Sequence, residues 1–207
     1  MCRRTLSSQK LAHPVFHNLM AYSGLSVIVL QQNLQMDMLC PHILLQRMKS
    51  IFIKVTYDSI ISEQGDKPIK AYGLLALPKD RSSSSMPIIS YQHGTAFGKH
   101  EVPSYAFSDQ INPLSYETRL MVAQFASQGY ILIAADYFGI GNSNEPEAYT
   151  VKASEQQACL DLYKAVIAFL DNEQIAYSDL FLTGWSQGGL VTTCSATITL
   201  SGRRQLS

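Results

Sequence analysis

Short apolar runs alternate with helix-patterned segments from residue 86 onward, and this order limits the fold more than any other feature of the chain. Strand-like runs occupy residues 86–92, 130–135 and 180–183, while residues 116–125 and 154–170 repeat apolar side chains at helical spacing. A helix that connects two strands of one sheet brings those strands side by side in parallel. The sequence therefore predicts a parallel sheet flanked by helices.

Two further strand-like runs precede this unit. Residues 51–57 alternate between two faces, and residues 69–77 resume strand composition after a short polar turn around Gly65. Two such runs around a short turn predict a β-hairpin. The polar, serine-rich stretch at residues 79–85 then predicts a surface loop, whose backbone groups bond to solvent.

The sequence predicts one folded domain, with an unassigned segment before it and an atypical tail after it. Residues 1–50 show no sustained strand or helix period and hold three of the five histidines. Residues 51–190 make up the predicted domain. Residues 191–207 are atypical, because a helix is expected there but the tail is rich in β-branched residues, which are poor helix formers.

The net charge and the length of the apolar runs exclude two classes of partner, nucleic acids and membranes that the chain would span. Lys plus Arg and Asp plus Glu each total 16, so the formal net charge is zero and no long-range field attracts nucleic acid. The longest apolar run near the start, residues 25–30, is much shorter than the roughly 18 residues of a membrane-spanning helix. We expect neither a nucleic-acid partner nor a membrane span.

The sequence contains neither a clear signal peptide nor the cysteine spacing of a metal site. Arg3, Arg4 and Lys10 precede a moderately apolar stretch, but no small-residue cleavage site follows, so the start shows no clean signal peptide. The compartment stays open between cytoplasmic and secreted. The four cysteines are widely scattered and lack the paired spacing of a zinc or redox site, so we predict no metal site.

The sequence Gly184-Trp185-Ser186-Gln187-Gly188 matches G-x-S-x-G and follows directly on a predicted strand. A sharp turn at this place would hold Ser186 on a strained backbone above the sheet, as in a nucleophile elbow. Side chains at 184 or 188 would crowd the turn or the helix after it. The alternative is a glycine-rich loop with an inert serine, and we expect Ser186 to be a catalytic nucleophile.

A serine that attacks a carbonyl group needs N–H donors for the oxyanion that forms. One candidate is the backbone N–H of Gln187, directly after the nucleophile. The second candidate is the N–H of Thr95, because His93-Gly94-Thr95 ends the strand at residues 86–92 and Gly94 permits a close backbone approach. We expect His93 to brace this loop.

Three stretches together carry a family resemblance. They are residues 91–95, 134–143 and 184–189, and their order and spacing match an oxyanion loop, the loop after the next strand and a nucleophile elbow. The chain resembles the α/β-hydrolase family over roughly residues 51–190, and most of all its lipase and esterase members of secretory-lipase type. The resemblance implies a partial α/β-hydrolase fold: a mostly parallel sheet with flanking helices, and with the later strands missing. It also implies that Asp136 is a structural residue at a strand end.

The sequence departs from this family after the serine. In the family the triad acid and histidine follow the nucleophile in chain order, which also argues against His93 as the base. Residues 190–207 contain no His, Asp or Glu. The resemblance therefore predicts an incomplete triad and an inactive chain, and a truncated or frame-shifted reading frame is one hypothesis for its origin.

Several functions stay open at this point. The resemblance implies a serine hydrolase that acts on carboxylic esters, with a small-molecule acyl ester as substrate if the chain is active, and with no metal or organic cofactor. A peptidase or thioesterase of the same fold is an alternative, as is a non-catalytic fragment or interaction remnant, so enzyme activity itself is undecided. Without later strands the nucleophile strand would be a hydrophobic edge, so self-association through that edge is a further expectation.

Overall fold

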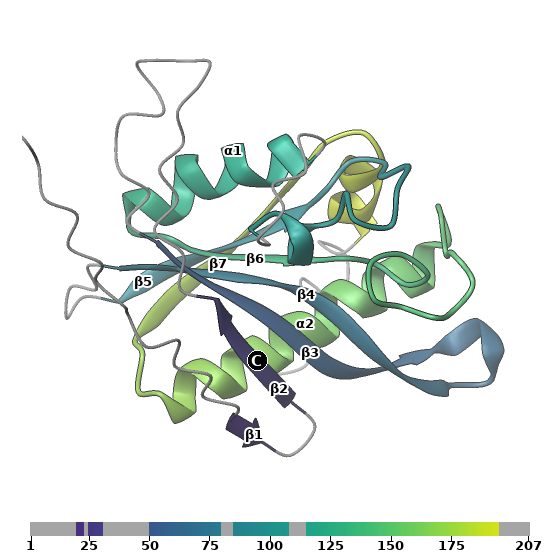
Figure 1. Ribbon diagram of the computed structural model, residues 1–207, viewed down its shortest axis with the longest axis horizontal. Coiled ribbons are helices and arrows are strands. Elements are labelled where there is room, and N and C mark those ends of the chain that lie inside the picture. Colours follow the sequence, from purple (N-terminus) through teal and green to yellow (C-terminus); the bar gives the residue numbers. More distant parts are fainter. Residues whose placement is uncertain (1–19, 23–24, 31–49, 80–84, 108–114, 195–207) are drawn as a thin grey trace, which may run out of the picture.

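Seven strands make one sheet in the part of the chain that the computed structural model describes, which is residues 20–22, 25–30, 50–79, 85–107 and 115–194. The strands lie in the order β1-β2-β3-β4-β6-β5-β7 across the sheet (Figure 1). Their bounds are β1 Met20–Tyr22, β2 Leu25–Leu30, β3 Ser50–Ile61, β4 Lys67–Pro78, β5 Met86–Gln92, β6 Ile131–Ala135 and β7 Tyr177–Gly184.

The predicted hairpin is formed by β3 and β4. They pair antiparallel along their whole length and are joined by the short helical turn η1 (Ser62–Gln64). Gly65 ends this turn with a φ of 70°, a left-handed conformation that glycine adopts without steric cost. The antiparallel strands β1 and β2 extend the sheet beyond β3. Part of the segment left unassigned by its sequence therefore belongs to the sheet.

The strands that lead to the candidate site run parallel. β5 lies between β6 and β7 and is parallel to both, as the strand, helix, strand order predicts. The four pairings among β1, β2, β3, β4 and β6 are antiparallel. The described sheet is therefore mixed, and the expectation of a mostly parallel sheet is corrected, because the N-terminal strands add only antiparallel pairings.

Two helices cover opposite faces of the sheet (Figure 1). The side chains of α1 (Tyr116–Phe125) pack in one core cluster with Leu132 of β6, and those of α2 (Lys152–Asn172) pack in the other with Ile133. Neighbouring residues of a strand point to opposite faces, so each helix covers its own side. A third helical segment spans residues 187–194.

The predicted bounds of α1 agree with the structure. Its buried residues are Thr118, Arg119 and Val122, whereas Tyr116 is exposed. A guanidinium nitrogen of Arg119 donates to the Ala106 carbonyl, and this local partner explains how a charged residue can face the core. Within the described ranges no helix is long and apolar enough to cross a membrane.

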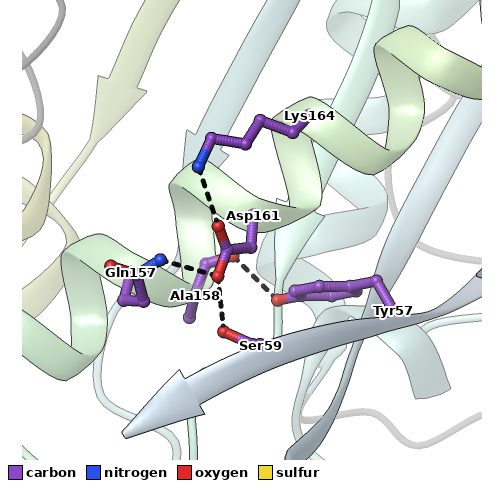
Figure 2. Close-up of polar contacts among 6 residues, drawn as sticks. All are labelled: Tyr57, Ser59, Gln157, Ala158, Asp161 and Lys164. Atoms are coloured by element: carbon purple, nitrogen blue, oxygen red, sulfur yellow. Dashed lines mark hydrogen bonds and ion pairs between the residues drawn. The ribbon is translucent and has the colours of Figure 1, made fainter. Parts of the chain in front are cut away.

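Polar contacts fix α2 against the hairpin, as Figure 2 shows. The Asp161 carboxylate accepts hydrogen bonds from the Ser59 hydroxyl at 2.8 Å and from the Gln157 amide at 2.7 Å. The Tyr57 hydroxyl donates to the Ala158 carbonyl at 2.8 Å. The bonds of Tyr57 and Ser59 join the middle of α2 to β3, whereas the bond from Gln157 lies within the helix.

Some predictions fall outside the described residues. Most of the serine-rich loop at 79–85 does so, as do most of residues 1–50 and residues 195–207 of the tail.

Candidate active site

Ser186 lies in a strained turn between β7 and the helical segment 187–194. Its φ is 52°, in a left-handed region that a non-glycine residue rarely occupies. The Ser186 carbonyl accepts bonds from the N–H groups of Gly189 at 3.0 Å and Leu190 at 3.3 Å, so the helix begins immediately after the turn. The Ser186 residue is exposed. The turn therefore holds the serine at the surface, at the end of a strand.

The glycines on either side of this turn have no room for a side chain. A Cβ atom at Gly184 would lie 2.6 Å from the Gly188 carbonyl oxygen and 2.7 Å from that of Gln92. At Gly188 it would lie 1.9 Å from the Gln92 carbonyl oxygen and 2.7 Å from that of His93. Because these neighbours are backbone atoms, they cannot turn away. The helix after Ser186 is thus packed directly against the end of β5.

The loop after β5 makes a second contact with this turn. A Cβ atom at Gly94 would lie 3.0 Å from the indole nitrogen of Trp185. The Gly94 N–H donates to the Glu117 carboxylate at 3.0 Å, which fixes the loop to the first turn of α1. Thr95 follows directly. The structure therefore brings residues 93–95 and 184–188 together at the carboxyl ends of the neighbouring parallel strands β5 and β7, where α/β sheets generally bind ligands.

Two backbone N–H groups near Ser186 have no acceptor among the described residues. The N–H of Gln187 belongs to the first turn of a helix, where N–H groups lack an intrahelical partner. The N–H of Thr95 also bonds to no described group. Neither of the two predicted oxyanion donors is therefore taken by another group in the described ranges.

His93 is buried beneath the oxyanion loop. Its Nδ1 atom lies 2.6 Å from the Gly94 carbonyl oxygen, and its ring stacks on Tyr137 with a centroid distance of 4.2 Å. The Tyr137 hydroxyl donates to the His93 carbonyl at 3.2 Å. Burial lowers the pKa of His93 to about 4, so the ring is neutral near pH 7. These contacts are those of a residue that braces the loop.

The buried acid Asp136 follows β6. Its Oδ1 atom accepts the Ser104 N–H at 2.8 Å, while Oδ2 has no partner among the described residues. Burial raises the pKa of this carboxyl to about 6. The bond from Ser104 ties one loop to the strand end, which agrees with the structural role that the resemblance implies.

No described histidine is bonded to Ser186. Of the five histidines, only His93 and His100 lie in the described ranges, and neither is bonded to the Ser186 hydroxyl there. In the same ranges, no group of three or more His, Cys, Asp or Glu side chains is placed to hold a metal ion.

A small cavity of about 30 Å³ adjoins the oxyanion loop. Its lining is polar and includes the side chains of Glu101 and Glu117. The space suits about one water molecule rather than an acyl chain.

Sequence reasoning missed Glu155, which contacts the elbow from the first turn of α2. This side chain is only 1% exposed, and it accepts a hydrogen bond from the side-chain amide of Gln187. Burial raises its pKa. A signal was present: Glu155 precedes the apolar residues Ala158 and Leu162 by three and seven positions, so it lies on the apolar stripe of its helix.

Comparison with known proteins supports the fold. A model of the prolyl oligopeptidase family matches residues 116–200, which is less than half of the chain. No curated protein sequence matches the chain.

Solved structures match a larger share of the chain than the family model does. A Legionella pneumophila protein named as a hydrolase is 27% identical over 76% of this chain, with a TM-score of 0.64. The rice cell wall degrading esterase LipA from Xanthomonas oryzae is 27% identical over 73% of the chain, also with a TM-score of 0.64. Candida antarctica lipase A, at 21% identity over 73% of the chain and a TM-score of 0.58, shows the fold alone.

The chain spans 40%, 38% and 34% of these three proteins, respectively. The resemblance predicted from three sequence motifs is confirmed by these matches. Over its described residues, the chain therefore has part of the α/β-hydrolase fold, in the form found in esterases and lipases.

Proposed function

We propose that this chain supplies the nucleophile and the oxyanion donors of a serine hydrolase that acts on carboxylic esters. One observation carries the proposal: Ser186 occupies a left-handed conformation between a strand and a helix, with glycines at 184 and 188 packed against backbone. Backbone strain of this kind persists only where the surrounding structure enforces it, and it is concentrated at functional sites. Here it exposes Ser186 at the surface, directly before the N–H group of Gln187.

In this proposal Ser186 Oγ attacks the acyl carbon, and a base takes the hydroxyl proton. The carbonyl oxygen becomes an oxyanion, which the N–H groups of Gln187 and Thr95 bind. The ester C–O bond then breaks, the alcohol leaves with the proton, and water later hydrolyses the acyl-serine. His93 is a poor base for this reaction, because it is buried and its Nδ1 atom already faces the Gly94 carbonyl.

The base therefore comes from outside the described residues. A site that retains its oxyanion donors but lacks a triad member keeps roughly 10³-fold catalysis over water in well-studied serine hydrolases. We expect this chain alone to acylate slowly, and to acylate faster when a small base such as imidazole is added, because Ser186 is exposed and accessible to it.

Esters are favoured over other acyl substrates because the similar structures at 26% and 27% identity include a cell wall degrading esterase. The match to the prolyl oligopeptidase family keeps a peptidase as the second candidate for the same site. Both reactions use the same nucleophile and oxyanion donors. Comparing nitrophenyl esters with peptide nitroanilides distinguishes these two substrate classes.

The test is acylation by p-nitrophenyl butyrate, followed as a nitrophenol burst and as a mass increase of the intact chain, with and without imidazole. We expect imidazole to accelerate acylation of the wild-type chain but not of Ser186→Ala. Ser178→Ala is the matched control, because Ser178 is an exposed serine of β7, the strand that leads to the elbow. Equal acylation of the wild type and Ser186→Ala in folded samples would refute the proposal.

A second, non-catalytic function is also proposed: association with another copy of the chain through the edge of β7. Among the described strands β7 pairs only with β5, and Phe181 and Leu190 are 51% and 47% exposed. Unpaired apolar edges favour strand pairing between chains. Sedimentation velocity should show concentration-dependent dimers that Phe181→Lys weakens and that Phe97→Lys, at a 93% exposed residue of the loop after β5, leaves intact. A monomer at all concentrations would exclude this function.

A further inference from the structure

Glu155 joins three parts of the site through one carboxylate oxygen. Its Oε1 atom accepts the side-chain amide of Gln187 and also the backbone N–H of Thr150, the latter at 3.0 Å. The second carboxylate oxygen is buried and has no partner among the described residues. The first turn of α2, the loop before it and the first residue of the helix after the elbow therefore meet at this side chain.

The loop before α2, which contains Thr150, has a strained backbone. Thr150 has a φ of 58°, which is unfavourable for a β-branched residue. The bond from its N–H to Glu155 supports that conformation, and Glu155 in turn bonds to Gln187, the neighbour of the nucleophile. A strained residue and the strained elbow are thus linked through one buried acid.

Burying an ionisable acid costs stability unless hydrogen bonds or an opposite charge compensate for the lost solvation. The hydrogen bonds between α2 and β3 are made further along the helix, by Asp161 with Ser59 and by the Ala158 carbonyl with Tyr57. The Gln187 side chain is long and would otherwise be free to rotate at the surface of the helix start. Its bond to Glu155 removes that freedom and fixes the peptide unit to which the side chain is attached.

We propose that Glu155 is a positioning residue of the candidate site, which holds Gln187 so that its backbone N–H points to the oxyanion beside Ser186. This inference rests on the proposed ester hydrolase function. It assigns Glu155 no direct contact with substrate. The residue acts through Gln187 and, by way of Thr150, through the loop that precedes α2.

The titratable groups around Glu155 allow its ionisation to be followed separately. Cys159 lies one turn further along α2, and burial raises its pKa to about 12. The pKa of Tyr137, on the loop after β6, is raised well above its usual value. Glu63, on the η1 turn, accepts bonds from Ser154 and has a lowered pKa. Burial raises the pKa of Glu155 above its usual value, and Glu155→Gln distinguishes its ionisation from that of the neighbouring groups.

The direct readout is the side-chain amide of Gln187 in NMR spectra of the ¹⁵N-labelled chain, assigned by its loss in Gln187→Met. We expect these resonances to move with pH, with a midpoint above that of an ordinary glutamate. Glu155→Gln should abolish the movement, because an amide does not ionise. Gln187 resonances that are independent of pH in the wild type would overturn the proposal.

The functional readout is imidazole-assisted acylation of Ser186 in two variants of nearly equal size. Glu155→Gln keeps an acceptor oxygen for Gln187 and Thr150, so its rate should stay within about threefold of wild type. Glu155→Met removes the acceptor, and its rate should fall about tenfold, since losing an oxyanion donor outright costs roughly 100-fold or more. Equal rates in the two variants would overturn the positioning role.

A matched control separates positioning from destabilisation of α2. Asp161→Ala removes an acid of the same helix that bonds to Ser59, Gln157 and Lys164 (Figure 2). It should lower stability without slowing acylation. If Ser186→Ala abolishes acylation but Glu155→Met does not slow it, the positioning role alone is wrong. If Ser186→Ala leaves the rate unchanged, the proposed function is wrong and the positioning role falls with it.

Discussion

Gly188 and Gln92 approach so closely that a Cβ atom on Gly188 would lie 1.9 Å from the Gln92 carbonyl oxygen. This contact joins the helix after Ser186 to the end of β5, nearly a hundred residues earlier in the chain. Gly188→Ala must therefore push these two backbones apart. Overpacking of this kind typically costs about 1–3 kcal/mol, and we expect a loss of at least about 2 kcal/mol in the free energy of unfolding.

Gly189→Ala is the control for that substitution. The adjacent glycine lies in the same helix, but its nearest neighbour for a Cβ atom is at 3.7 Å, an ordinary contact. Alanine is favoured over glycine inside helices by roughly 0.5–1 kcal/mol. Chemical denaturation should show Gly188→Ala destabilised and Gly189→Ala unchanged or stabilised, whereas equal losses at both positions would contradict the packing described for the elbow.

Asp136→Asn should change how stability depends on pH. The folded state raises the pKa of Asp136 from 3.8 to about 6, so it favours the protonated carboxyl. This contribution to stability is fully present below about pH 3.8 and is lost as the pH rises through 6. The loss corresponds to about 3 kcal/mol. Unfolding curves between pH 4 and 8 should show the variant gaining on the wild type as pH rises, and a constant difference would count against a buried, ionisable Asp136.

His93→Asn should have a pH profile of opposite sign. The folded state lowers the pKa of His93 from 6.5 to about 4, so it favours the neutral ring. The stability due to His93 is therefore present above about pH 6.5 and is lost as the pH falls through 4, by about 3 kcal/mol. The amide of asparagine can still donate near the position of Nδ1. We expect the wild type to lose its advantage over this variant on acidification, and a gain instead would show that His93 is charged in the folded state.

Asp161→Ala tests the attachment of α2 to the hairpin. The carboxylate accepts hydrogen bonds from Ser59 and Gln157, and its removal leaves these donors without an acceptor (Figure 2). We expect a cost of about 1–3 kcal/mol in thermal or chemical unfolding. Lys164→Ala removes only an exposed ion-pair partner of the same aspartate, so its effect should stay below about 0.5 kcal/mol. A larger loss at Lys164 than at Asp161 would contradict this assignment.

The strands β5 and β6 and the elbow could be predicted because each is specified by residues close together in the sequence. The strands β5 and β6 are short apolar runs bounded by polar or turn residues, and β5 was predicted with its observed ends. The elbow was predictable because G-x-S-x-G follows a strand directly. Strand–helix–strand order also predicted the parallel pairing of β5 with its neighbours.

The remaining features depend on contacts between distant residues. The strands β1 and β2 are short, and β2 is paired with β3, more than twenty residues later in the chain, so residues 20–30 carry little periodic signal of their own. The approach of Gly188 to Gln92 has no counterpart in the local sequence. Glu155 is the exception, since a charged residue on the apolar stripe of α2 is visible in the sequence and marks a buried polar contact.

The central claim is that the elbow presents Ser186 as a nucleophile, and a fluorophosphonate probe with peptide mapping tests it most directly. The folded chain would be treated with the probe with and without imidazole, and labelling would be compared at Ser186 and at the exposed Ser178 of β7, the strand before the elbow. We expect the adduct at Ser186, formed faster with imidazole and absent in Ser186→Ala. A folded chain in which Ser186 reacts no faster than Ser178 would contradict the claim.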